Sequence, residues 1–183
     1  MTAPHCPAVL LVARHAEAEY EGSQDDGADD ESGQLTPPGR EQAARLATAL
    51  QGRRIAAAYS SVMGRAAQTA MIVADRLAVL CAQLAGIEEC ADGESEASVL
   101  GRFRAALEEV ADQHPGETVL VVSHGGAMSV ALPRLCDNVT EELSRARWLA
   151  HCASVEVQIG AEGWLLGRWP GSLDPAVAEQ SAV

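Results

Sequence analysis

The fold is decided first by the stretch Ala8-Val9-Leu10-Leu11-Val12-Ala13, which runs directly into Arg14-His15. A short apolar run that is rich in branched residues is typical of a buried β-strand. Two further runs of this kind occupy 55–59 and 118–122, and each is followed by polar residues. We therefore expect three buried strands, each ending in side chains that can do chemistry.

Helical patterns separate these strands. Thr36-Pro37-Pro38 opens one helix, because Thr can cap a helix and Pro is tolerated in the first turn, where its missing N–H has no partner. Apolar residues at helical spacing predict three more helices, at about 63–77, 95–113 and from Gly126 to about 135. The final strands, at 153–159 and 163–169, read as a closing hairpin.

This alternation predicts an α/β fold, a three-layer sandwich with a mostly parallel central sheet and helices on both faces. The length of 183 residues fits one domain, 1–183, with a sizeable core. The residues from about 172 to 183 are expected to form a loose tail.

Composition excludes several classes of function. The net charge is −13 and no basic patch is apparent, so nucleic acid is not expected as a partner. No apolar run approaches the roughly 18–20 residues of a membrane helix, and no secretion signal is visible at the start, so we expect a cytoplasmic protein with no membrane partner. The five cysteines show no C-x-x-C pair, which argues against a disulfide framework and a zinc site.

The segment 17–33 is acidic and contains no Lys or Arg, which predicts a mobile loop. It leaves a non-catalytic alternative open, a binding module that holds Ca²⁺ or a basic partner. The oxygen ligands for a cation would be Asp25, Asp26, Asp29, Asp30 and Glu31. Their order does not follow the EF-hand spacing, so we favour a solvated loop.

Three predicted strands end close to candidate functional residues: Arg14-His15, Ser60-Ser61 shortly before Arg65, and Ser123-His124. Ligands of parallel sheets bind beyond the carboxyl ends of the strands, so two His and two Arg would meet at one rim. Arg has a planar fork of donors that matches phosphate. A neutral His can attack phosphorus and form a covalent intermediate, and the leaving oxygen then needs a proton from a carboxylic acid.

Four motifs, in the same order along the chain, resemble those of the histidine phosphatase superfamily, the phosphoglycerate mutase-like proteins of branch 1. Residues 11–17 are similar to its R-H-G-E signature, 35–43 to L-T-x-x-G-x-x-Q-A, 59–70 to S-S-x-x-x-R-A-x-Q-T-A, and 121–126 to V-S-H-G-G. The resemblance implies that His15 is the phosphorylated nucleophile. It also implies that Arg14, Arg65 and His124 complete the phosphate pocket, that Glu41 and Gln42 lie on a supporting helix, and that no metal or cofactor takes part.

The proton donor is assigned from a looser match. Ile87-Glu88-Glu89 and Gly93 fit the family's frame with Glu89 as the general acid, while Glu88, Asp92 and Glu94 remain alternatives. The gap between Thr69 and this segment suits one helix and one extended segment. Two departures stand out: Ala16 replaces the usual Gly, although we expect the turn to survive, and the insertion that family members carry after this point is short, which predicts a short cap.

These expectations describe a phosphohydrolase that removes a phosphoryl group from a phosphomonoester or a phosphoprotein through a phosphohistidine. A phosphoglycerate or sugar-phosphate mutase is the enzymatic alternative, but a mutase needs a covered, water-poor site, and the short cap argues against one. The sequence does not identify the substrate or the oligomeric state. His5, His114 and His151 are assigned to surface or structure, and whether His151 approaches the site stays open.

Overall fold

The computed structural model describes residues 6–19, 33–139 and 149–169. Its elements alternate as predicted: β1 (Ala8–Arg14), α1 (Pro37–Leu50), β2 (Ile55–Ser60), α2 (Gly64–Leu77), β3 (Leu80–Gln83), α3 (Glu96–Gln113), β4 (Thr118–Ser123), α4 (Gly125–Leu135), β5 (Ser154–Gly160) and β6 (Gly163–Arg168). The expected strands and helices are present, with boundaries that shift by one or two residues.

The strands form one six-stranded sheet in the order β3-β2-β4-β1-β5-β6. β4 lies between β1 and β2 and is parallel to both, and β3 is parallel to β2. β5 and β6 form the closing hairpin and run antiparallel. The prediction of a mostly parallel sheet is confirmed. The register pairs Arg14 with Ser123, and Ser60 with Val122, so the carboxyl ends of β1, β2 and β4 meet at one edge.

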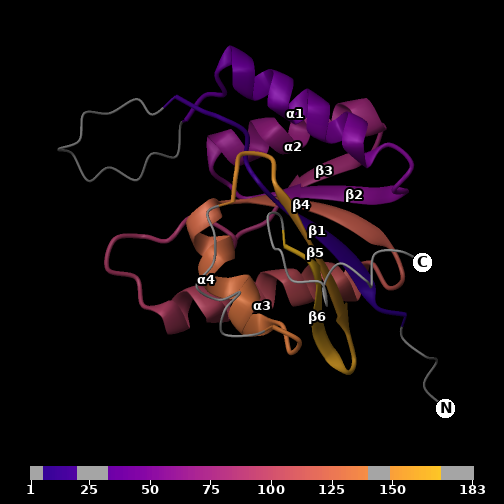
Figure 1. Ribbon diagram of the computed structural model, residues 1–183, viewed down its shortest axis with the longest axis vertical. Helices are drawn as coiled ribbons and strands as arrows, with labels where there is room; N and C mark the ends of the chain where they lie inside the picture. The colour runs from indigo at the N-terminus through magenta and orange to yellow at the C-terminus, as the bar shows by residue number, and fades with distance from the viewer. Residues whose placement is uncertain (1–5, 20–32, 140–148, 170–183) are drawn as a thin grey trace.

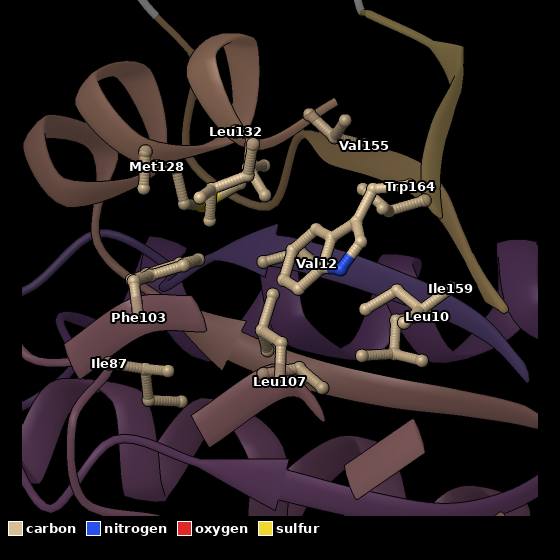
Figure 2. Close-up of a cluster of buried hydrophobic side chains, with 14 of the residues drawn as sticks. Leu10, Val12, Ile87, Phe103, Leu107, Met128, Leu132, Val155, Ile159 and Trp164 are labelled. Atoms are coloured by element: carbon tan, nitrogen blue, oxygen red, sulfur yellow. The ribbon is translucent and has the colours of Figure 1, made fainter. Parts of the chain in front are cut away.

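Helices cover both faces of the sheet, with α1 and α2 on one side and α3 and α4 on the other (Figure 1). Alternate residues of each strand point to opposite faces, so β1 supplies both cores. Leu10 and Val12 pack in the cluster that contains Phe103 of α3, which Figure 2 shows. Leu11 and Ala13 pack in the cluster under α1 and α2. β1 and β4 therefore contribute side chains to the hydrophobic cores on both faces of the sheet.

β3 forms where the sequence indicated only an extended segment without bounds. All four of its side chains are exposed, because it is the edge strand next to β2. Residues 77–82 form one apolar run that begins at the end of α2, so the sequence does not set the strand apart, and only pairing with β2 defines it.

The region after the acid candidates is short, as predicted: α3 begins at Glu96, and its first turn is capped by the side chain of Ser95. Trp164 of β6 and Trp169, which directly follows β6, are buried in the core. Most of the acidic segment, the residues from 170 onward, His5 and Trp148 lie outside the described residues. Within the described ranges, no helix is long and apolar enough to cross a lipid bilayer.

Candidate active site

The sheet edge brings together the four side chains that the sequence placed at strand ends. Arg14 ends β1 and His15 follows it, Arg65 lies in the first turn of α2 after β2, and His124 is the N-cap of α4 after β4. All four are buried, with exposed fractions of 6%, 2%, 5% and 0% in that order. Two guanidinium groups and two imidazole rings at one edge of the sheet make a site that is suited to an anion.

The imidazole of His15 is held in one tautomer. Its Nδ1 lies 2.7 Å from the carbonyl oxygen of Ala16. A carbonyl oxygen only accepts hydrogen bonds, so Nδ1 carries the proton and donates, and in the neutral ring Nε2 keeps its lone pair. The Ala16 turn itself is held by Thr69 of α2, whose hydroxyl oxygen accepts a hydrogen bond from the Ala16 N–H at 3.0 Å. Among the described residues Ala16 is not one of those with positive φ, so the turn accommodates Ala without strain.

His15 is neutral at physiological pH. Burial lowers its pKa from 6.5 to about 4; the hydrogen bond to Ala16 opposes this shift, and the positive charges of Arg65 and Arg14 add to it. Desolvation and nearby charges of the same sign both disfavour the charged form of a group. The ring that would act as the nucleophile therefore keeps its lone pair available without a separate base.

His124 lies beside it, with the two ring centroids 5.2 Å apart. Its Nε2 lies 3.0 Å from the hydroxyl of Ser61, whereas its Nδ1 is buried with no hydrogen-bond partner in the part of the chain that the structure describes. Burial, followed by the charge of Arg65, lowers the pKa of His124 to about 2. The arrangement leaves one nitrogen of a neutral imidazole for a further partner.

Gly125 and Gly126 after His124 are needed for space rather than for unusual dihedral angles. A side chain at Gly125 would meet Cδ of Arg14 at 3.1 Å. A side chain at Gly126 would overlap the carboxylate of Glu89. The glycine pair therefore lets an arginine from β1 and a carboxylate from the 86–94 loop approach the first turn of α4.

Of the candidate acids, only Glu89 is placed against that turn. Its two carboxylate oxygens accept hydrogen bonds from the N–H groups of Gly126 at 3.1 Å and Ala127 at 2.7 Å. Glu88 turns back and accepts from the N–H of Gly86, and Glu94 pairs with Arg102. The geometry distinguishes the candidate carboxylates by their hydrogen-bond partners. It favours Glu89, because that side chain bonds to Gly126, which is two residues after His124 in the sequence.

α1 supports the site from outside, as the resemblance implied. Gln42 accepts a hydrogen bond from the N–H of Glu17 at 2.9 Å, and the Thr36 hydroxyl donates to the Glu17 carboxylate at 2.8 Å while it caps the helix. A side chain at Gly39 would overlap the Glu17 backbone, which explains a glycine in the first turn. Glu41 points into solvent and pairs with Arg45.

Comparison with known proteins accounts for this geometry. The family model of the histidine phosphatase superfamily (branch 1) matches residues 10–91 and 85–170. The chain belongs to this superfamily. It is 32% identical over 77 residues to a metal-independent phosphoserine phosphatase of Arabidopsis thaliana, a match that covers 42% of this chain and 30% of that protein.

Solved histidine phosphatases share the fold. A mycobacterial glucosyl-3-phosphoglycerate phosphatase in complex with VO3 aligns with a TM-score of 0.73 at 20% identity, over 90% of this chain and 99% of that one. A phosphoserine phosphatase from Entamoeba histolytica, in complex with phosphoserine, aligns with a TM-score of 0.72 at 20% identity, over 90% and 97% of the two chains.

In this member of the superfamily the structure also shows where His151 lies. Its ring centroid is 5.6 Å from that of His15, and the ring is half-buried. The preceding segment is fixed by Arg14, whose guanidinium donates to the carbonyl of Leu149 at 2.7 Å, and the next N–H, that of Cys152, donates to the Arg14 carbonyl at 3.0 Å. No pattern in the sequence signals this contact, because it depends on how the hairpin returns to β1.

His114 lies elsewhere and bonds to Tyr59 and Glu117, in agreement with a structural assignment. Within the described ranges, no group of three or more His, Cys, Asp or Glu side chains is arranged to hold a metal ion.

Proposed function

We propose that this chain is a phosphomonoesterase in which His15 takes up the phosphoryl group of the substrate. The observation that carries the proposal is the hydrogen bond from Nδ1 of His15 to the Ala16 carbonyl at 2.7 Å. It leaves the lone pair on Nε2, and the buried guanidinium groups of Arg14 and Arg65 lie close enough to act electrostatically on the ring. Membership of the histidine phosphatase superfamily supports the same assignment.

In the first step Nε2 of His15 attacks phosphorus, the new N–P bond forms, and the bond from phosphorus to the ester oxygen breaks. Arg14 and Arg65 stabilise the charge on the three phosphoryl oxygens, as charged donors do in phosphoryl transfer. His124 donates from Nδ1 to one of these oxygens while Nε2 accepts from the Ser61 hydroxyl. Protonated Glu89 gives its proton to the departing ester oxygen, which leaves as an alcohol.

In the second step a water molecule attacks the phosphohistidine and Glu89, now ionised, takes up the proton of that water. The N–P bond breaks, inorganic phosphate forms, and Nε2 of His15 regains its lone pair. The overall reaction consumes one water and one ester and releases one alcohol and one phosphate. Within the described residues α3 begins immediately after the 86–94 loop, with no long insertion between them, which supports hydrolysis over return of the phosphoryl group to a second substrate.

The substrate class that we propose is a small phosphate ester of an alcohol. The support comes from relatives whose names specify phosphoserine and glucosyl-3-phosphoglycerate phosphatases. A panel of such esters and of phosphorylated peptides, assayed for phosphate release, would define the preference.

The mechanism is tested by rapid quench with ³²P-labelled substrate. Labelled protein should carry phosphate that is labile in acid and stable in base, as a phosphohistidine is, and His15→Ala should abolish both labelling and turnover. His114→Gln, which changes a histidine outside the pocket, is the matched control and should label normally. Full turnover by His15→Ala, or an acid-stable label, would refute the phosphohistidine mechanism.

A further inference from the structure

Arg102 of α3 lies beside the 86–94 loop, although none of the four sequence motifs includes it. Its guanidinium has five N–H donors, and five hydrogen bonds use them: two to the Glu94 carboxylate at 2.8 Å each, and one each to the carbonyls of Gly86 at 3.0 Å, Glu88 at 2.9 Å and Glu89 at 3.1 Å. Its side chain is only 21% exposed.

These bonds replace the secondary structure that the 86–94 loop lacks. Four successive carbonyls, those of residues 86 to 89, are satisfied by side chains, three by Arg102 and the fourth, Ile87, by the hydroxyl of Ser123 at 2.7 Å. Partly buried carbonyls need such partners, because an unpaired one is destabilising. The course of the loop through Glu89 is thus set by one arginine and one serine.

Glu94 completes the arrangement from the far end of the loop. Its carboxylate also accepts hydrogen bonds from the Ala91 N–H at 3.2 Å and the Ser98 hydroxyl at 2.9 Å, so it ties the loop to the first turn of α3. The hydrogen bond from Arg102 is the largest cause that holds the pKa of Glu94 down, at about 2. The pair therefore stays ionised across the pH range in which an enzyme works.

We propose that Arg102, together with Glu94, is a positioning residue that fixes the loop so that the Glu89 carboxylate lies against the first turn of α4. This inference rests on the proposed function, since it gives Glu89 the role of general acid. In this chain the 86–94 loop passes directly into α3, and Arg102 supplies from that helix the order that the short loop cannot supply alone. The predicted consequence is selective: without Arg102, proton donation fails while phosphate binding and the attack by His15 continue.

The test uses a series of substituted phenyl phosphates, from p-nitrophenyl phosphate to phenyl phosphate, together with an alkyl phosphate. In Arg102→Met, kcat for the poorest leaving groups should fall by about 10- to 100-fold, since misplacing a general acid by an ångström has effects of this order. The value for p-nitrophenyl phosphate should change by less than about threefold, because that leaving group hardly needs a proton. Glu94→Gln should show the same selectivity in weaker form and serves if Arg102→Met does not fold.

Two matched controls are available on the same helix. Arg104 and Glu108 form an exposed pair, so Arg104→Met and Glu108→Gln should leave the slope of log kcat against leaving-group pKa unchanged. Arg102→Lys tests whether the slope depends on the donor geometry of the Arg102 side chain or only on its positive charge. Lysine keeps the positive charge, which also acts on His124, but it lacks the fork, so it should not restore the slope.

Glu89→Gln is measured in parallel. It distinguishes failure of the positioning role of Arg102 from failure of the general-acid role of Glu89. If Glu89→Gln steepens the slope while Arg102→Met and Glu94→Gln do not, positioning by Arg102 is refuted and the acid assignment stands. If Glu89→Gln leaves the slope unchanged, the acid assignment fails and the inference fails with it, while phosphohistidine formation on His15 is unaffected. Equal losses for all substrates in Arg102→Met, or full rescue by Arg102→Lys, would overturn the proposal in favour of a general structural or purely electrostatic role.

Discussion

The Glu89 carboxylate accepts a hydrogen bond from the backbone N–H of Gly126 at 3.1 Å, and it lies where a Gly126 side chain would be. Gly126→Ala should therefore displace this carboxylate without touching His15. We expect a loss of about tenfold or more in kcat for alkyl phosphates and a much smaller loss for p-nitrophenyl phosphate. Gly125→Ala, which would press on Arg14, should reduce both equally. Measured kcat for the two substrates in both variants decides the matter; identical profiles would show that the two glycines do not have separate roles.

Arg65 should need its guanidinium and not only its charge. Loss of one charged donor from a buried site reduces kcat/KM by about 2–4 kcal/mol in transition-state stabilisation, and Arg65→Lys should come close to this loss because a point charge cannot replace the fork. The exposed Arg104→Lys should have no effect. Steady-state kinetics with several esters checks this, alongside melting temperatures that exclude unfolding. Wild-type kinetics in Arg65→Lys would remove Arg65 from the phosphate pocket.

The folded protein should lose stability as the pH falls from 6.5 to 4, and His15 should be responsible for part of the loss. Its pKa is about 4 in the folded chain and 6.5 in the unfolded chain, so the unfolded chain binds the proton first and acid favours unfolding. The contribution of His15 is about 2–3 kcal/mol over this interval. Urea unfolding at several pH values should show a weaker pH dependence for His15→Gln. Identical pH dependence in the two proteins would mean that His15 titrates normally.

The tautomer of His15 can be read directly. In ¹⁵N-edited spectra of the imidazole at pH 7, Nδ1 should be protonated and Nε2 should not, because the Ala16 carbonyl accepts from Nδ1. His114→Asn simplifies the assignment and leaves the site intact. A spectrum with the proton on Nε2 would contradict the orientation of the nucleophile.

His151 should strengthen anion binding as the pH falls. Burial, followed by the charge of Arg14, lowers its pKa from 6.5, so it is neutral at pH 7.5 and gains positive charge beside His15 at lower pH. A unit charge at about 4 Å in a water-like medium contributes roughly 1 kcal/mol, or about fivefold in affinity. His151→Asn should therefore weaken inhibition by vanadate by up to about fivefold as the pH is lowered, and much less at pH 7.5. His114→Asn is the control, and an effect that is independent of pH would show that His151 acts only by its shape.

Local sequence patterns are sufficient to predict most of the helices and strands. Buried strands such as β1 and β4 are continuous apolar runs, and the helices carry apolar stripes with identifiable caps such as Thr36 and Ser95. β3 is not set apart in the sequence, since residues 77–82 form one apolar run that begins at the end of α2. β3 forms because β2 supplies its backbone hydrogen bonds, and that pairing cannot be read from the sequence of β3 alone.

The sequence by itself determined the strands other than β3, the helices, and the placement of Arg14, His15, Arg65 and His124 at one edge, because residues at the carboxyl ends of parallel strands must meet there. Only the tertiary structure distinguishes Glu88, Glu89 and Glu94, since carboxylates of one loop differ only in their hydrogen-bond donors, and Glu89 is the one that lies against the first turn of α4. Only the tertiary structure brought His151 to His15 and Arg102 to the 86–94 loop. These contacts join residues that lie far apart in the sequence or on separate elements, and their geometry is set by packing across the whole sandwich, which no local pattern encodes.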